Sequence, residues 1–224
     1  MYLSRIQLNR HRRDAWRLLS SPQRMHAAVL SSFLDPPTGA RSGASRVLWR
    51  LDAENAGRTF LYVVSPDRPD FAHLAEQAGW PSLDRGASKD YQAFLSAVTT
   101  GQRWAFRLTA NPTRYHRSGE GQRARRVAHV TAEYQEAWLL ERAEACGFRL
   151  VGADTAGSRA LAVTRRDVRQ FERRGSAKPV TIAVAQFDGV LDVIDADALR
   201  SALTTGVGPA KAYGCGLLTL APLH

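Results

Sequence analysis

The feature that most constrains the fold of this chain is a series of predicted strands and helices that runs through the same order twice. In the first half, apolar and polar residues alternate along residues 1–8, which is typical of a half-buried strand. Met25, Val29 and Phe33 then form an apolar stripe at helical spacing. The predicted elements of this half are strand, helix, helix, strand, strand, helix and strand at residues 1–8, 14–19, 21–34, 46–53, 59–66, 69–79 and 91–98.

The second half repeats this order without repeating the residues, if the two helical segments at 14–19 and 21–34 are counted as one. Its predicted elements are strand, helix, strand, strand, helix and strand at residues 102–112, 132–146, 159–168, 180–187, 195–204 and 216–222. This is the order of a ferredoxin-like unit, and 224 residues suffice for two domains. The sequence therefore predicts an α+β protein of two tandem ferredoxin-like (RRM-like) domains, at residues 1–98 and 99–224.

The charge of the chain points to a polyanionic partner. Lys and Arg number 31 against 21 Asp and Glu, which gives a net charge of +10 and an isoelectric point near 10.4. Arginines concentrate in residues 102–126 and 159–178, whereas carboxylates concentrate on the predicted helices of the second half. This distribution predicts a basic side of sheet and hairpin that binds nucleic acid, opposite an acidic helical side. The alternative is that the helices simply carry solvated carboxylates.

The cysteine content and the hydropathy of the chain indicate the cellular compartment to expect. The two cysteines, Cys146 and Cys215, are too few for a disulfide framework and do not have metal-ligand spacing. A reducing cytoplasm is the simplest location, and we expect neither a metal nor another cofactor. No run of about 18 uncharged apolar residues occurs, so we expect no association with a membrane.

A glycine-rich stretch, GVGPAKAYGCGLLTLAP, links the last predicted helix to the last predicted strand. Its glycines are Gly206, Gly208, Gly214 and Gly216. Without a Cβ, the backbone N–H groups of such a turn can come close to an anion. The alternative is a tight helix-to-strand connection that needs positive φ angles. A simple dinucleotide site is disfavoured, because the glycines of the Rossmann fingerprint precede a helix and these precede a strand.

The same stretch closely resembles the C-terminal glycine-rich motif of the CasE family, the CRISPR RNA-processing endoribonucleases of type I-E systems. The resemblance covers most of the chain. MYLSRIQL is similar to the family's first strand, RVLWRLD to its second, and FRLTANPTR to its F-R-L-x-A-N-P segment; EAWLLERAEACGFRL and VAQFDGVLDVID follow in the same order. The resemblance implies two tandem ferredoxin-like domains, in agreement with the order of the predicted elements.

The resemblance also implies a reaction and its partners. Such enzymes cut the repeat of the long CRISPR transcript at the base of a hairpin without a metal and leave a 2′,3′-cyclic phosphate. They stay bound to the mature guide within the Cascade complex. We therefore expect the CRISPR repeat hairpin, as precursor and as mature RNA, and the other Cascade subunits as partners.

His26 matches the family's catalytic histidine. Such cleavage needs a base for the 2′-OH, an acid for the departing 5′-oxygen and positive or N–H-rich surroundings for the phosphorane. His26 lies about 100° around the predicted helix from Met25, at the edge of the apolar stripe. Relatives commonly carry a tyrosine three residues earlier, where this chain has Gln23. The candidates for supporting the phosphate or the transition state are Gln23, Arg24 and Lys211.

The strand pair around VTRRDVRQFERRGSAKPV resembles the family's basic hairpin, which grips the RNA stem in its groove. Phosphate contacts of this kind give affinity and salt dependence, while a stem is recognised mostly by its shape. In the family the glycine-rich turn lies against the RNA backbone. The residues predicted to bind RNA are Arg165, Arg166, Arg169, Arg173, Arg174, Lys178, Gly206, Gly208, Gly214 and Gly216. Tyr213 is expected to pack rather than to catalyse.

Two other functions stay open. The first is a Cascade subunit that binds the RNA hairpin but cleaves it weakly, because the amide of Gln23 cannot act as an acid. The second is a generic protein of two RNA-recognition modules. The sequence disfavours the second, because it lacks the aromatic platform K/R-G-F/Y-G/A-F-V-x-F/Y.

Overall fold

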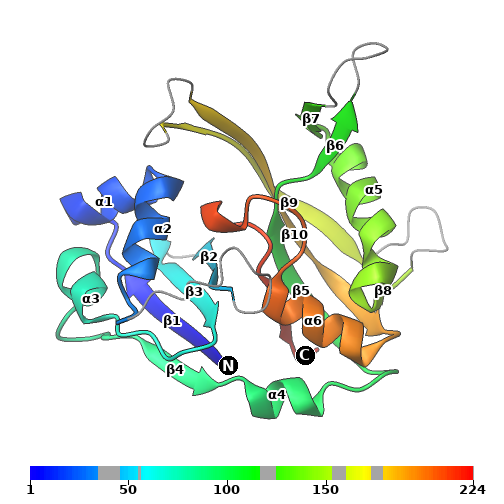
Figure 1. The fold of residues 1–224 in the computed structure, drawn as a ribbon, viewed down its shortest axis with the longest axis horizontal. Helices are drawn as coiled ribbons and strands as arrows, with labels where there is room; N and C mark the ends of the chain where they lie inside the picture. Colours follow the sequence, from blue (N-terminus) through cyan, green and yellow to red (C-terminus); the bar gives the residue numbers. More distant parts are fainter. Residues whose placement is uncertain (35–45, 55–56, 117–124, 153–159, 173–178, 224) are drawn as a thin grey trace.

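Two antiparallel sheets with helices packed on them lie side by side in the computed structural model (Figure 1). The structure describes residues 1–34, 46–54, 57–116, 125–152, 160–172 and 179–223. Within these ranges, no helix is both long and apolar enough to span a membrane.

The first sheet comes from the N-terminal half and has the strand order β2-β3-β1-β4. Its strands are β1 (Tyr2–Leu8), β2 (Leu48–Ala53), β3 (Thr59–Ser65) and β4 (Ala87–Asp90). The helices of this half that pack on it are α1 (Arg13–Leu19), α2 (Pro22–Leu30) and α3 (Ala72–Ala78). Ala15, Met25 and Leu74 of these helices share one buried cluster with Ile6 and Leu61 of the sheet.

The segment at residues 91–98 contains a helix, α4 (Gln92–Ala97), so the predicted strand there is wrong. Tyr91, Leu95 and Val98 are buried at spacings of four and three residues, which is the period of a helix. The strand that completes the sheet is β4, which directly precedes α4. Most residues of β4 are exposed, so this strand lacks the apolar alternation by which a strand is predicted.

The second sheet comes from the C-terminal half and has the strand order β11-β5-β10-β8, with β9 also paired to β10. Its strands are β5 (Arg103–Ala110), β8 (Phe148–Leu150), β9 (Leu161–Phe171), β10 (Val180–Val193) and β11 (Leu218–Ala221). The helical segments of this half are α5 (Ala132–Ala143), η3 (Glu144–Cys146), α6 (Ala196–Thr205) and η4 (Lys211–Tyr213). A separate strand pair consists of β6 (Thr113–His116) and β7 (Arg125–Ala128). The sequence predicted neither this pair nor β8.

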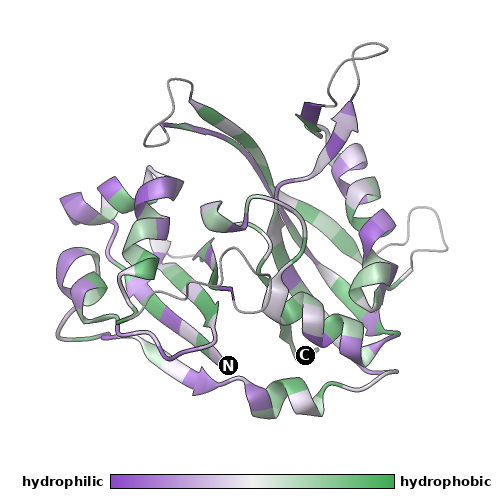
Figure 2. Ribbon diagram, in the orientation of Figure 1, coloured by the Kyte–Doolittle hydropathy of each residue, from purple (hydrophilic) through white to green (hydrophobic). Residues whose placement is uncertain are grey.

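Both sheets have the strand order of a ferredoxin-like unit, because β1 lies between β3 and β4 in the first sheet and β5 lies between β10 and β11 in the second, where β8 is an additional strand. The α+β fold class with tandem ferredoxin-like domains is therefore confirmed. The division after residue 98 stays a prediction. One buried cluster includes Leu48 and Val64 of the first half together with Leu108 and Trp138 of the second. Figure 2 shows hydrophobic residues along β3 and β10, and both hydrophilic and hydrophobic residues on α1 and α3.

A buried ion pair joins the two sheets. Arg50 of β2 is 2% exposed, and its Nε and Nη2 donate to the two carboxylate oxygens of Asp52 at 2.7 and 2.9 Å. Its Nη1 donates to the backbone oxygens of Arg107 on β5 and Leu217 beside β11, at 2.9 and 3.0 Å. These four contacts compensate the guanidinium for its loss of water. The relative position of the sheets is thus fixed by directional bonds as well as by apolar packing.

Candidate functional site

Helix α2 holds His26 at the edge between core and solvent. The Oγ of Ser21 accepts a hydrogen bond from the backbone N–H of Arg24 at 3.4 Å, and Pro22 takes the first helical position. Met25 is fully buried, whereas the next residue, His26, is partly exposed. The predicted start of this helix and the edge position of His26 are confirmed. The helix ends at residue 30, four residues earlier than predicted.

The imidazole of His26 has one nitrogen enclosed by the protein. Its Nδ1 is buried and has no hydrogen-bond partner among the described residues. Burial lowers the pKa of His26 from its ordinary value of 6.5, because the imidazolium is poorly solvated there. The ring is therefore neutral at neutral pH and able to accept a proton. Since Nδ1 is enclosed, a substrate can meet the ring only through Nε2.

Gln23 and Arg24 precede His26 on the same helix but take different faces. Gln23 is partly exposed and stands three residues before His26, so the two side chains are neighbours on one face. Arg24 is exposed and stands two residues before His26, a spacing at which helical side chains do not face each other. Helix geometry thus brings Gln23, and not Arg24, beside the histidine.

The four glycines of the C-terminal tail all need a left-handed backbone. Their φ angles lie between +76° and +93° at Gly206, Gly208, Gly214 and Gly216. A Cβ on Gly214 would lie 2.6 Å from the indole of Trp49, and one on Gly208 would lie 2.8 Å from the indole of Trp138. The predicted need for positive φ angles is confirmed, and the groups that come so close to the tail are indoles of β2 and α5. Contact between these glycines and RNA stays a prediction.

Hydrogen bonds fix the tail against β5 and β2. The N–H of Val207 donates to the oxygen of Gly216 at 2.9 Å, and the N–H of Gly216 donates to the oxygen of Thr109 at 2.6 Å. Arg50 holds the next carbonyl, that of Leu217. The ion pair that joins the two sheets therefore also fixes the end of the glycine-rich tail.

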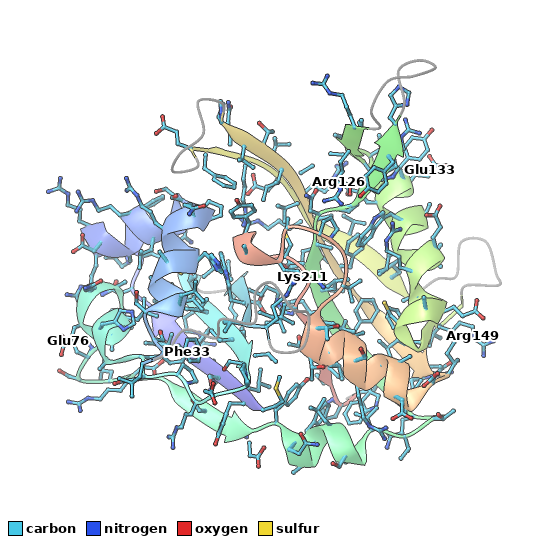
Figure 3. All side chains as sticks on the ribbon, in the orientation of Figure 1. Phe33, Glu76, Arg126, Glu133, Arg149 and Lys211 are labelled. Atoms are coloured by element: carbon cyan, nitrogen blue, oxygen red, sulfur yellow. The ribbon has the colours of Figure 1, made fainter. Side chains whose placement is uncertain are left out.

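The short helix η4 brings Lys211 to α2. η4 contacts both α2 and β2, and Figure 3 shows Lys211 near the middle of the molecule. Burial, and then the nearby charge of Arg46, lower the pKa of the half-buried Lys211 ammonium group. The tail thus places a positive charge on an element packed against the helix of His26. Tyr213 of η4 packs on Phe171 of β9, with ring centroids 4.7 Å apart, as expected.

The arginines of the β9–β10 hairpin are divided between its two faces. The pairing of β9 with β10 shifts register after Gln186. Beyond that point Arg165 and Arg169 line a narrow cleft together with Leu51 of β2, on the side of the first sheet. Arg166 alternates with them and therefore lies on the opposite face. The other hairpin residues predicted to bind RNA lie outside the described residues; they are Arg173, Arg174 and Lys178.

The cysteines have no neighbours suited to a metal site. Burial raises the pKa of the Cys215 thiol to about 12, and burial also raises the pKa of the Cys146 thiol. Across the described ranges, no three His, Cys, Asp or Glu side chains are grouped so that they could hold a metal ion.

Sequence reasoning missed Arg50 and Asp52, which connect the sheets and the tail. A signal for them exists in the stretch LWRLD. Two opposite charges stand two residues apart within an apolar strand, so both side chains point to the same face of the sheet. A charged pair on one face of an otherwise apolar strand indicates a buried ion pair.

Comparisons with known proteins agree along the whole chain. A family model described as "CRISPR associated protein" matches residues 1–222. The chain is 33% identical to the CRISPR-associated endoribonuclease Cse3 of Thermus thermophilus, over 99% of this chain and all of that protein. It is 31% identical to the CRISPR system Cascade subunit CasE of Escherichia coli, over 79% of this chain and 89% of that protein.

Solved structures give the same result. The structure of the CRISPR endoribonuclease Cse3 bound to a 19-nucleotide RNA superposes with a TM-score of 0.80 at 30% identity, over 99% of this chain and all of that one. Family model, sequence identity and fold thus coincide over nearly every residue. The chain belongs to the Cse3/CasE family of CRISPR-associated endoribonucleases.

Proposed function

We propose that this chain is a metal-independent endoribonuclease that cuts CRISPR precursor RNA at the base of the repeat hairpin. We further propose that it leaves a 2′,3′-cyclic phosphate and stays bound to the mature guide within Cascade. The name of the Thermus relative and the structure of Thermus thermophilus Cse3 bound to an RNA that represents a pre-cleavage complex support the activity and the substrate class. The name of the Escherichia relative supports the assembly into Cascade.

The observation that carries the proposal is the state of His26. The ring is partly exposed and neutral, and Nδ1 is enclosed by the protein. In the proposed reaction Nε2 accepts the proton of the 2′-OH, the 2′-oxygen attacks the adjacent phosphorus, and the bond from phosphorus to the 5′-oxygen breaks. The departing 5′-oxygen takes up a proton, which water can supply. The products are a 2′,3′-cyclic phosphate and a 5′-hydroxyl end.

In the proposed reaction, Lys211 stabilises the negative charge that builds up on the phosphorane. Four N–H groups of the tail already donate within the protein, those of Gly206, Val207, Tyr213 and Gly216, and Lys211 is the charged residue of the tail. The ammonium group of Lys211 is therefore the donor of the tail best suited to an anionic phosphate. Gln23, as the face neighbour of His26, can donate a hydrogen bond to the phosphate but cannot supply a proton.

Arg165 and Arg169 are proposed to hold the stem. They line the cleft between the β9–β10 hairpin and β2, which is the side of the hairpin that faces the half carrying His26. An A-form stem offers mainly phosphates and 2′-hydroxyls to such side chains, so these contacts position the RNA without reading its sequence.

The test is cleavage of a labelled repeat hairpin in EDTA, with analysis of the size and the 3′ end of the product. We expect one cut near the base of the stem and a cyclic phosphate. His26→Ala should lower the single-turnover rate at least about a hundredfold, with unchanged affinity for the hairpin. His11→Ala, which alters an exposed histidine before α1, is the matched control. Equal rates for both variants would exclude His26 as the base.

Gln23 favours a second candidate, a Cascade subunit that binds the hairpin and cuts it weakly. The same experiment separates the two functions. Tight binding of the hairpin without a cut by the wild-type chain would establish the second. In that case Gln23→Tyr, which restores the tyrosine common among relatives, should bring cleavage back.

A further inference from the structure

The largest group of exposed aromatic and apolar side chains lies away from the candidate site, where β6 and β7 meet the start of α5. We call it the distal surface and define it by Arg114, Tyr115, Arg125, Arg126 and Tyr134. Among the described residues, ten large hydrophobic side chains are exposed. Four of them lie on or beside this surface: Tyr115, Val127, Val130 and Tyr134. Such a concentration marks a site of interaction.

The distal surface is basic. The strands β6 and β7 carry three arginines and no carboxylate. Figure 3 shows Arg126 and, at the beginning of α5, Glu133 at the same end of the molecule. Glu133 is the carboxylate nearest in sequence to the strand pair on the α5 side, against the three arginines of β6 and β7. A positive surface with exposed aromatic rings suits nucleic acid, because arginines bind phosphates and the rings can stack on bases.

Tyr115 and Arg126 are held together at the centre of the surface. The guanidinium carbon of Arg126 lies 5.3 Å from the centroid of the Tyr115 ring, and its Nη2 donates to the phenol oxygen at 2.8 Å. The tyrosine is nevertheless 70% exposed. The cation therefore lies toward the hydroxyl end of the ring, and most of the ring stays exposed and able to stack on a base.

The strand pair is fixed to the rest of the protein. The N–H of His129 donates to the oxygen of Pro112 at 2.9 Å, and the side-chain amide of Gln135 on α5 donates to the oxygen of His129 at 2.9 Å. The surface therefore has a fixed position relative to the second sheet.

Arg166 of β9 extends the basic surface toward the hairpin. Arg166 pairs with Ala185 of β10, and Ala185 pairs with Ala110, the last residue of β5. β6 begins three residues after Ala110, and α5 contacts β9. Arg166 faces this side, away from the cleft of Arg165. Arg165 and Arg166 thus belong to two different basic surfaces, one on each face of the hairpin.

We propose that the distal surface binds unpaired nucleotides that flank the repeat stem, with one base stacked on Tyr115 and phosphates bound by Arg125, Arg126 and Arg166. This inference rests on the proposed function for the presence of the stem. Unpaired nucleotides are the ligand that fits, because only bases outside a duplex expose a face to a tyrosine.

The experiment compares dissociation constants for four RNAs: the bare repeat hairpin, the hairpin with an unpaired 5′ or 3′ extension, and the better of these extensions in abasic form. Each RNA carries a 2′-deoxynucleotide at the cut position, so that the proposed reaction cannot remove the extension. We expect one extension to tighten binding by the wild-type chain about tenfold, which is the range of a single stacked base. Tyr115→Ala should abolish most of this gain, and Tyr115→Phe should keep it. Binding of the bare hairpin should not change. With the wild-type chain, removal of the base from the extension should reduce the gain in affinity by the same factor as Tyr115→Ala reduces it with the complete extension.

Arg126→Ala should weaken binding of the extended RNA and lower the slope of log Kd against log salt by about 0.7 for each phosphate that the variant no longer neutralises. The matched control is Arg149→Ala on β8, an exposed arginine at the other end of this half in Figure 3. No gain from either extension, or an equal gain in all variants, would overturn the inference. If the bare hairpin does not bind at all, the proposed function fails, and the extension alone as single-stranded RNA still tests the surface.

Discussion

His26 illustrates which properties of a single residue helix periodicity can predict and which it cannot. The offset of His26 from Met25 places it at the edge of the helix, and the structure agrees. The enclosure of Nδ1 was not predictable, because it depends on the surroundings of α2, which include η4, about 190 residues later in the chain. Periodicity locates a side chain on its own helix, whereas the state of the side chain depends on distant neighbours.

The lowered pKa of His26 leads to a prediction for the pH dependence of cleavage. A base works only in its neutral form, so the rate falls as the pH drops through the pKa of the histidine. Since burial lowers that pKa below 6.5, the midpoint of the acidic limb should lie below 6.5. Single-turnover rates from about pH 4.5 to 8 would measure it. A midpoint at or above 6.5 would mean that His26 is not the buried base that limits the reaction.

Gly214 and Gly101 form a matched pair for testing the tail. Both have positive φ angles, +80° and +87°, but a Cβ meets the ring of Trp49 at Gly214 and nothing within 4 Å at Gly101. Gly101→Ala should lower the free energy of unfolding by about 1 kcal/mol through backbone strain alone. Gly214→Ala should lower it by about 2–4 kcal/mol, because overpacking adds to the strain. Urea denaturation would measure both, and equal losses would show that the contact with Trp49 is not tight.

At the scale of the element, the β9–β10 hairpin shows that a sequence pattern predicts the presence of a strand more readily than the direction in which its side chains point. The sequence predicted both strands, although they extend to residues 171 and 193 rather than 168 and 187. It could not tell which arginines share a face. The register shift after Gln186 changes the phase of β9, so that Thr164 and Arg165 do not simply continue the alternation set by Val163.

The division of the hairpin predicts different effects for its arginines. Arg165→Ala with Arg169→Ala should weaken binding of the bare repeat hairpin and lower the salt slope by about 0.9 for each phosphate that is no longer neutralised. Arg166→Ala, on the opposite face, should leave this affinity unchanged. Fluorescence anisotropy at several salt concentrations would show the difference. An equal loss for Arg166→Ala would mean that the stem contacts both faces of the hairpin.

The wrong strand prediction at residues 91–98 has a related cause. Tyr91, Leu95 and Val98 pack on the second half of the protein, and Arg200 of α6 donates to the backbone oxygens of Leu95 and Val98 at 2.9 and 2.7 Å. β4 itself is an edge strand with an exposed sequence, ASKD. An exposed edge strand carries little apolar signal, so the pattern favoured the neighbouring apolar residues instead.

At the scale of the whole molecule, element order predicted two tandem ferredoxin-like units, and the structure has them. Element order says nothing about how two such units join. Here the joint consists of a buried cluster that spans both halves and of the pair formed by Arg50 and Asp52. That pair also holds the carbonyl of Leu217, so the joint and the glycine-rich tail depend on the same side chain.

Arg50→Ala should therefore destabilise the whole chain. It leaves Asp52 buried with only Arg107 at 3.5 Å, takes the donor from the carbonyl of Leu217, and leaves the carbonyl of Arg107 with only the side-chain hydroxyl of Thr219 at 3.4 Å among side-chain donors. Loss of one partner of a buried pair lowers the free energy of unfolding by about 3–5 kcal/mol. Arg17→Ala is the control, because its pair with Asp14 is exposed and should contribute less than about 1 kcal/mol. Urea denaturation of both variants would check this, and similar losses would contradict the role of Arg50.

The indoles beneath the tail restrict how this family can vary over evolutionary time. Trp49 and Trp138 lie where side chains at positions 214 and 208 would be. A larger residue at either glycine is tolerable only after the facing tryptophan has become smaller and the backbone has left its left-handed conformation. We therefore expect selection to remove single substitutions at these positions. The tail and the two tryptophans should change together in distant relatives, as covarying pairs that connect the end of the chain to each of its halves.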